Sequence, residues 1–293
     1  MQTFQTPGPL KLRLRVPAGE VELVTLDGSE TSVDIEPLRH DEATEAAVAE
    51  ARVELRERGG GAGELVVEIL EQGVGGRFGF LFGRSPQVRV RISCPHGADL
   101  ELKSKSADLE ARGRYGQVDV ETTSGDVACG DVEGAVRIHC VSGDARFGRV
   151  QGAAEVNSVS GDVHGEQTIG EATLNSVSGD VRLREAGGSV SVNTVSGDQT
   201  LEAVQQGTVT AHSVSGDVSI AIRRGSRVWI DANSRSGDVT SELDVQDARP
   251  EGESPTVELR VQTLSGDIAI TRALGPPDRG PAETAPAAGE LER

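Results

Sequence analysis

One tripeptide, Ser-Gly-Asp, recurs along the chain and constrains its fold more than any other feature. A degenerate copy, Ser106-Ala107-Asp108, lies 18 residues before the first full copy. The first five full copies are 18 residues apart, and the later steps are 19, 21 and 29 residues. The full copies begin at Ser124, Ser142, Ser160, Ser178, Ser196, Ser215, Ser236 and Ser265. A repeat of this length is typical of a solenoid, in which each unit forms one coil.

Apolar and polar residues alternate on both sides of each copy. After one copy, Val181 and Leu183 flank the polar Arg182, and before the next copy the apolar positions are Val190 and Val192. This period-two pattern predicts strands with one buried face. Eighteen residues suit a coil of two or three short strands that pairs in parallel with its neighbours about 4.8 Å away. We therefore predict an all-β fold, a parallel β-solenoid of about nine coils.

The repeated tripeptide itself predicts a tight corner. Glycine tolerates a positive φ, and aspartate can bond to its own backbone in an Asx turn. Stacking would place nine carboxylates in one column, where neighbours about 4.8 Å apart repel by about 1 kcal/mol in water. The column comprises Asp108, Asp126, Asp144, Asp162, Asp180, Asp198, Asp217, Asp238 and Asp267. Backbone N–H groups and serine hydroxyls, or alternatively Ca²⁺ ions, could satisfy it; we favour the structural corner, because the glycine-rich calcium nonapeptide is missing.

The repeats divide the chain into three parts. Residues 1–97 carry strand-like runs and an Ala- and Glu-rich segment, 41–50, that predicts a short helix. We expect them to form a β-rich cap, because the open edge of a solenoid promotes aggregation. Residues 98–274 form the repeat solenoid. The tail, 275–293, is rich in Pro, Ala and Glu and is predicted to be disordered.

Composition excludes several classes of partner. A net charge of −18 disfavours binding to nucleic acid or to an anionic membrane. Three cysteines without a C-x-x-C pair, and scattered histidines, indicate neither a disulfide framework nor a metal site, and no cofactor is expected. His139 and His212 share a repeat position with asparagines and are predicted to be surface residues. No signal peptide or apolar membrane segment is visible, so we expect a cytoplasmic protein.

Two surfaces are candidates for binding a protein. The first is a set of valines just before the corner: Val141, Val159, Val177, Val195 and Val214. They form an exposed stripe if alternation continues, and join the core if the chain bends; we favour the inward bend, because bare valine ladders promote aggregation. The second is the glycine-rich run 73–84, where Phe78, Phe80 and Phe82 either pack on the first coil or form a hydrophobic finger.

A resemblance to a known family rests on two features of the sequence: the run from Ile92 to Ser106 and the repeated Val-Ser-Gly-Asp-Val that follows it. The chain resembles the bacterial putative-adhesin family, a β-strand-repeat domain of unknown function (domain of unknown function 4097), over about residues 90–272. The resemblance implies a β-solenoid-like fold and a link to the cell envelope or its stress response. It supplies no catalytic residues.

The repeats also argue against an enzyme, because a catalytic site is normally one asymmetric constellation and not nine copies. We therefore predict a non-enzymatic scaffold or protein-interaction module with an unidentified protein partner, and leave open whether copies associate with one another. The alternatives are a secreted or surface adhesin that binds glycans and, third, a carbohydrate-active β-helix enzyme.

Overall fold

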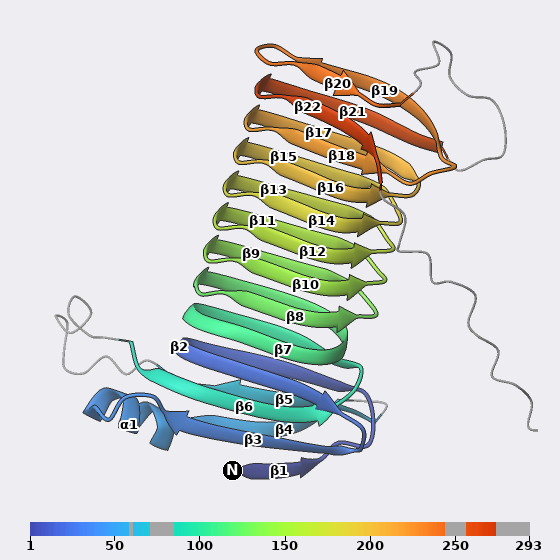
Figure 1. Ribbon diagram of the computed structural model, residues 1–293. Helices are drawn as coiled ribbons and strands as arrows, with labels where there is room; N and C mark the ends of the chain where they lie inside the picture. The colour runs from blue at the N-terminus through green and yellow to red at the C-terminus, as the bar shows by residue number, and fades with distance from the viewer. Residues whose placement is uncertain (59–60, 71–84, 244–255, 274–293) are drawn as a thin grey trace, which may run out of the picture.

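Two parallel β-sheets face each other along the whole stack of coils in the computed structural model (Figure 1). The structure describes residues 1–58, 61–70, 85–243 and 256–273. Each coil contributes one strand to each sheet. From β8 (Val127–Val132) to β18 (Val218–Ile222), each strand pairs in parallel with the equivalent strand of a neighbouring coil, 18 or 19 residues away. The parallel β-solenoid predicted from the sequence is therefore confirmed.

Strands make up nearly all of the regular structure. The N-terminal elements are β1 (Gln2–Gln5), β2 (Leu10–Leu26), β3 (Glu30–Pro37), α1 (Glu42–Ala49), β4 (Arg52–Arg58), β5 (Ala62–Glu68), β6 (Gln87–Pro95) and β7 (Ala98–Ser124). The first sheet of the repeats contains β8 (Val127–Val132), β10 (Ala145–Val150), β12 (Val163–Thr168), β14 (Val181–Ala186), β16 (Gln199–Val204), β18 (Val218–Ile222), β20 (Val239–Ser241) and β22 (Ile268–Arg272). The second contains β9 (Val136–Ser142), β11 (Ala154–Ser160), β13 (Ala172–Ser178), β15 (Val190–Ser196), β17 (Gly207–Ser215), β19 (Arg227–Ser234) and β21 (Thr256–Ser265).

The core is a thin layer of aliphatic side chains stacked in rows. Val156, Leu174 and Val192 occupy equivalent positions on β11, β13 and β15 and are fully buried. The alternating polar positions point outward, as the period-two pattern predicts. Tyr115 and Phe147 are the large aromatic side chains within this core. Small and branched residues dominate because the two sheets of one flat coil leave little space between them.

Each Ser-Gly-Asp corner depends on its glycine for two separate reasons. Gly161 and Gly179 adopt φ values of +125° and +132°, a region that other residues rarely occupy. A Cβ on Gly179 would also lie 2.3 Å from the carbonyl oxygen of Gly161 in the preceding coil. The corners therefore stack backbone on backbone, which only glycine permits.

Parallel stacking continues into the N-terminal region. β2 spans both sheets and pairs in parallel with β7 on one side and with β5 and β6 on the other. Antiparallel pairing begins beyond this point, where β4 adds to β5, β3 adds to β6, and β1 adds to β3. The helix α1 lies beside this end (Figure 1), and Asp41 accepts a hydrogen bond from the Thr44 N–H as its N-cap. The short helix predicted at 41–50 is thus confirmed.

The last two coils stack in the reverse of their chain order. β21 pairs with β17 on one side and with β19 on the other, and β22 likewise lies between β18 and β20. The coil of residues 227–241 is therefore outermost, and the final repeat lies inside it (Figure 1). A simple progression along the chain would place the final repeat at the end. The long 29-residue step to Ser265 gives the chain enough length to return.

Candidate interaction surface

The nine repeat aspartates lie in one column along the corner. In eight consecutive steps, the backbone N–H of one aspartate donates to Oδ1 of the aspartate in the neighbouring coil, at 2.8–3.0 Å. Because the last two coils are reversed, Asp267 lies between Asp217 and Asp238 in this column. Each bond ties a carboxylate to the next coil.

These hydrogen bonds explain how a column of like charges is tolerated. A hydrogen bond to an ionised acceptor contributes about 1.5–3 kcal/mol, which offsets a repulsion of about 1 kcal/mol between neighbours. The N–H of Asp162, with a contribution from Arg146, holds the pKa of Asp144 below its usual value. Within the described ranges, no group of three or more His, Cys, Asp or Glu side chains is placed to hold a metal ion. The carboxylates of the column therefore bind the backbone of the neighbouring coil.

Substitution of Asp162 separates its hydrogen bond from its charge. Asp162→Ala is expected to lower the free energy of unfolding by about 1–2 kcal/mol, because the Asp180 N–H loses its acceptor. Asp162→Asn keeps an acceptor oxygen, and its weaker neutral hydrogen bond is offset by the loss of repulsion with the neighbouring carboxylates, so stability is expected to change by less than about 0.5 kcal/mol. Urea denaturation measures both. A calcium-dependent rise in melting temperature that Asp162→Asn abolishes would contradict this role and favour an ion column.

The valines before the corner point outward, so the inward bend expected from the sequence is wrong. They form an apolar stripe of one residue per coil, each 45–49% exposed. The apolar stripe consists of Val141, Val159, Val177, Val195, Val214 and Leu264. Alternation continues because the preceding residue, such as Ser158 or Thr194, takes the last inward position. Such a small side chain fits at the narrow corner, where Thr194 Oγ1 donates to the Gly197 carbonyl at 3.4 Å.

A ladder of side-chain amides runs beside the apolar stripe. The amide row consists of Asn157, Asn175 and Asn193. Asn175 Nδ2 donates to Asn157 Oδ1, and Asn193 Nδ2 donates to Asn175 Oδ1, both at 2.8 Å. Asn157 Nδ2 lies 3.2 Å from Nδ1 of His139, and His212 follows Asn193 in the same register. His139 and His212 are thus exposed continuations of the row. The ladder fixes the amide orientations, which leaves a rigid polar strip.

The central part of this face has no formal charge. The outward residues of β13, β15 and β17 include no Asp, Glu, Lys or Arg. They are Thr173, Asn175, Val177, Ser191, Asn193, Val195, Thr210, His212 and Val214. The opposite sheet instead carries ion pairs such as Arg184–Glu166 at 3.0 Å. In a chain of net charge −18, this neutral area stands apart from the rest of the surface.

Shallow hollows flank the neutral area at both ends. One of about 540 Å³ lies over Lys103, Glu121, His139 and Val159. Another of about 520 Å³ lies over the last coils, where Arg235 and Leu264 contribute to its lining. Both follow the line between the amide and apolar positions. The described residues of this face therefore form a long, shallow surface.

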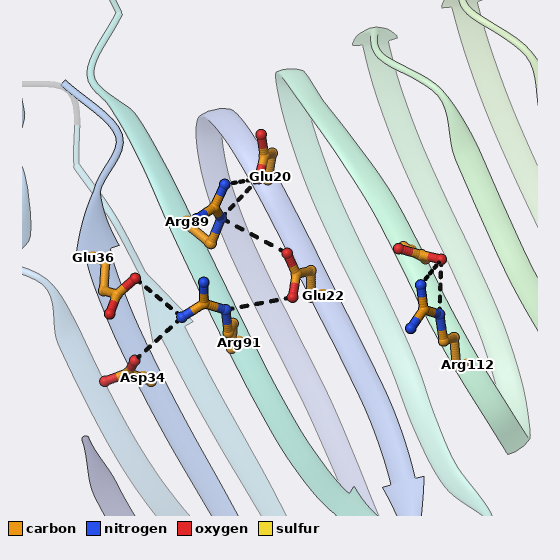
Figure 2. Close-up of polar contacts among 8 residues, drawn as sticks. Glu20, Glu22, Asp34, Glu36, Arg89, Arg91 and Arg112 are labelled. Carbon is orange, nitrogen blue, oxygen red and sulfur yellow. Dashed lines mark hydrogen bonds and ion pairs between the residues drawn. The ribbon is translucent and has the colours of Figure 1, made fainter.

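Ion pairs link the strands of the N-terminal region on the outer surface (Figure 2). Arg89 Nε donates to Glu20 at 2.8 Å, and Arg91 lies 3.4 Å from Glu22 and 3.0 Å from Glu36. The hydrogen bond to Glu20 raises the pKa of the Arg89 guanidinium. These pairs join β6 to β2 and β3. Each acidic group drawn has an arginine beside it, and the pairs of Arg89 and Arg91 cross from one strand to another and help to align them.

The three cysteines are buried free thiols, Cys94, Cys129 and Cys140. Burial raises the pKa of Cys94 and of Cys129 to about 12 and also raises that of Cys140. Since the thiolate is the reactive form, the folded chain is expected not to react with a thiol reagent at pH 8, while the unfolded chain reacts at all three. Rapid labelling of the folded chain would contradict this burial.

The stability that these protonated thiols contribute is complete below pH 9 and is expected to fall as the pH rises towards 12.

The second candidate surface is the phenylalanine run. Phe78, Phe80 and Phe82 lie within residues 71–84, outside the described residues, so the hydrophobic finger stays a prediction. The disorder predicted for residues 275–293 likewise lies outside the described residues. No helix of the described residues has the length and apolar character required to cross a membrane.

Comparison with known proteins gives a family-level match. A family model described as Toastrack DUF4097 matches residues 21–271. A solved structure described as a putative adhesin from Bacteroides fragilis is 13% identical, with a TM-score of 0.42, and the match covers 92% of this chain and 95% of that one. A putative cell adhesion protein from Clostridium sporogenes is 10% identical, with a TM-score of 0.25, over 92% of this chain and 98% of that one. No curated protein matches the chain.

Proposed function

The chain belongs to the Toastrack DUF4097 family, and on that premise we propose that it is a non-enzymatic scaffold that binds a protein partner through the outer face of its second sheet. The observation that carries this proposal is the apolar stripe. Isolated exposed valines are common on protein surfaces, but six apolar residues on adjacent strands form a continuous strip. A strip of this kind on a regular sheet is typical of an interaction surface.

The electrostatics of the face support a protein partner. A partner that approaches the neutral area avoids the repulsion that a net charge of −18 imposes elsewhere. The amide row supplies fixed donors and acceptors beside the apolar stripe, a combination of apolar core and polar flank that protein interfaces share. Nucleic acid is a poor fit, because no basic residue points outward from β13, β15 or β17.

The rigidity of the face also favours binding. The stripe residues occupy paired strands, and their side chains have few rotatable bonds. Little conformational entropy is therefore lost when a partner covers them. The repetition of one chemistry over successive coils suits an extended partner segment that follows the stack.

A double substitution tests this face. Val177→Lys with Val195→Lys places two charges in the centre of the apolar stripe, where both side chains are already half exposed. Affinity for the captured partner is expected to fall at least about tenfold, because two desolvated lysines replace two apolar contacts. A pull-down from the source cells, followed by a binding titration with the captured partner, measures the change.

A matched control uses the opposite sheet. Thr200→Lys with Ser219→Lys adds the same two charges at outward positions of β16 and β18 and is expected to leave binding unchanged. Equal binding by both double variants would exclude the apolar stripe as the interface. A third variant, Phe78/Phe80/Phe82→Ser, tests the other candidate, since loss of the partner there alone would assign binding to the phenylalanine run.

A further inference from the structure

The outermost coil leaves a strand edge open at the C-terminal end of the stack. β19 pairs with β21 along its whole length, from Arg227 to Ser234, and the described residues place no strand on its other side. Alternate N–H and C=O groups of a paired strand point to its free side, so this edge can accept another strand. At the opposite end of the solenoid, antiparallel strands and α1 cover the stack.

The inward positions of β19 carry no charged residue, which is one of the features that usually protect an edge. The strand contains Val228, Trp229 and Ile230, which all favour β structure, and it has neither Pro nor Lys. Val228 and Ile230 pack against the core but are only partly buried. Their counterparts one coil inward, Val257 and Leu259, are fully buried. The core therefore ends with apolar surface that a further strand would cover.

The charge of the outermost coil differs from that of the whole chain. This coil, residues 227–241, contains two arginines and two aspartates, a net charge of zero, whereas the chain as a whole carries −18. Two copies that meet at this end avoid most of the repulsion between their acidic bodies. The outermost coil therefore combines an open strand edge with a neutral charge balance, which suits contact with a second copy.

The sequence of β19 is self-complementary in one antiparallel register. If Trp229 faces Trp229 of a second copy, Arg227 lies opposite Asp231 of that copy, and the same pair forms again by symmetry. In this register Val228 lies opposite Ile230 on the inward side, which continues the apolar core across the junction. We propose that two copies of the chain join end to end through antiparallel pairing of β19, with Trp229 at the twofold axis. The contact is isologous, so it closes as a dimer and does not extend into a fibre.

Sedimentation of the full chain over a concentration series tests the dimer. The expected result is a reversible monomer–dimer equilibrium. Because Trp229 is the one tryptophan of the sequence, its emission is expected to shift to shorter wavelength as the dimer forms. A monomer at every concentration up to the solubility limit would overturn the proposal, and so would a dimer whose Trp229 emission does not change.

Charge reversal tests the register. Asp231→Arg places like charges opposite each other at both ends of the contact and is expected to weaken dimerisation at least about tenfold. Adding Arg227→Asp restores both pairs in swapped form and is expected to recover most of the loss. Arg137→Glu reverses a charge in the outward row of β9, inside the stack, and is expected to have no effect. No recovery in the double variant would reject this register.

Disulfide cross-linking tests the same register independently, and it remains informative if a charge variant fails to fold. Opposed residues of antiparallel strands have Cβ atoms about 4.5–5.5 Å apart, so Trp229→Cys is expected to form an intermolecular disulfide on mild oxidation. Asn233→Cys, on the same strand and face, lies opposite Gly225 in this register and is expected not to cross-link to itself. Equal cross-linking at both positions would indicate random collision and refute the proposal. Since these variants leave the apolar stripe intact, failure here is distinct from failure of the proposed function.

Discussion

Gly179→Ala is expected to lower the free energy of unfolding by about 3–5 kcal/mol, a large effect for one added methyl group. Gly179 has φ +132°, where a Cβ is strained. The new Cβ would also lie 2.3 Å from the Gly161 carbonyl oxygen and 3.2 Å from Asp162 Oδ1. The corner cannot relax without separating two coils, so strain and clash combine. Urea denaturation followed by circular dichroism measures the loss.

Gly28→Ala is the matched control for this effect. Gly28 has a similar φ of +138°, but no atom lies within 4 Å of the position that its Cβ would take. Only the backbone strain remains there, which is worth about 1–3 kcal/mol. The difference between the two variants isolates the contribution of close coil stacking. Equal losses would show that the corners do not stack backbone on backbone.

Phe147→Ala is expected to cost about 3–5 kcal/mol, because it removes one of the few aromatic side chains of the core. The ring extends into the neighbouring coil at Gly165, where a Cβ would lie 2.4 Å from Phe147 Cζ. Gly165→Val alone is therefore expected to destabilise the chain by about 1–3 kcal/mol through overpacking. Glycine at this inward position compensates for a large neighbour.

The double variant provides the sharper measurement. In the Phe147→Ala background, Gly165→Val fills part of the space that the ring vacated, so the same substitution is expected to stabilise the chain. A change of sign between the two backgrounds requires direct contact between positions 147 and 165. Additive losses would mean that the two positions do not touch and that the coil register is different.

The repeat period carries most of the fold information. Residues 18 apart share an environment, so alternation around each Ser-Gly-Asp reveals both the strands and the inward rows. The order of the coils is not encoded in the same way. Every coil offers nearly the same edge to its neighbours, so β21 can follow β17 as well as β19 can. The 29-residue step before Ser265 was the one signal of a departure from simple stacking.

The direction of the valine side chains could not be derived from the pattern alone. Val159 lies next to the corner, where either a strand or a turn can begin, and the two choices point its side chain in opposite directions. The deciding feature was the small residue before it, Ser158, whose size matches the narrow end of the core. Equivalent positions hold Cys, Ser or Thr in every repeat from Thr122 to Ser213, a signal that favoured the outward valine.

Each coil of the repeat region is tied to the next by an aspartate that accepts a hydrogen bond from a backbone N–H of the neighbouring coil. A crystal structure of the full chain tests it directly through the eight distances from aspartate N to aspartate Oδ1. The expected values are 2.8–3.0 Å at every step, with Asp267 between Asp217 and Asp238. Aspartates dispersed over the surface, or Asp238 bonded to Asp217, would contradict the account.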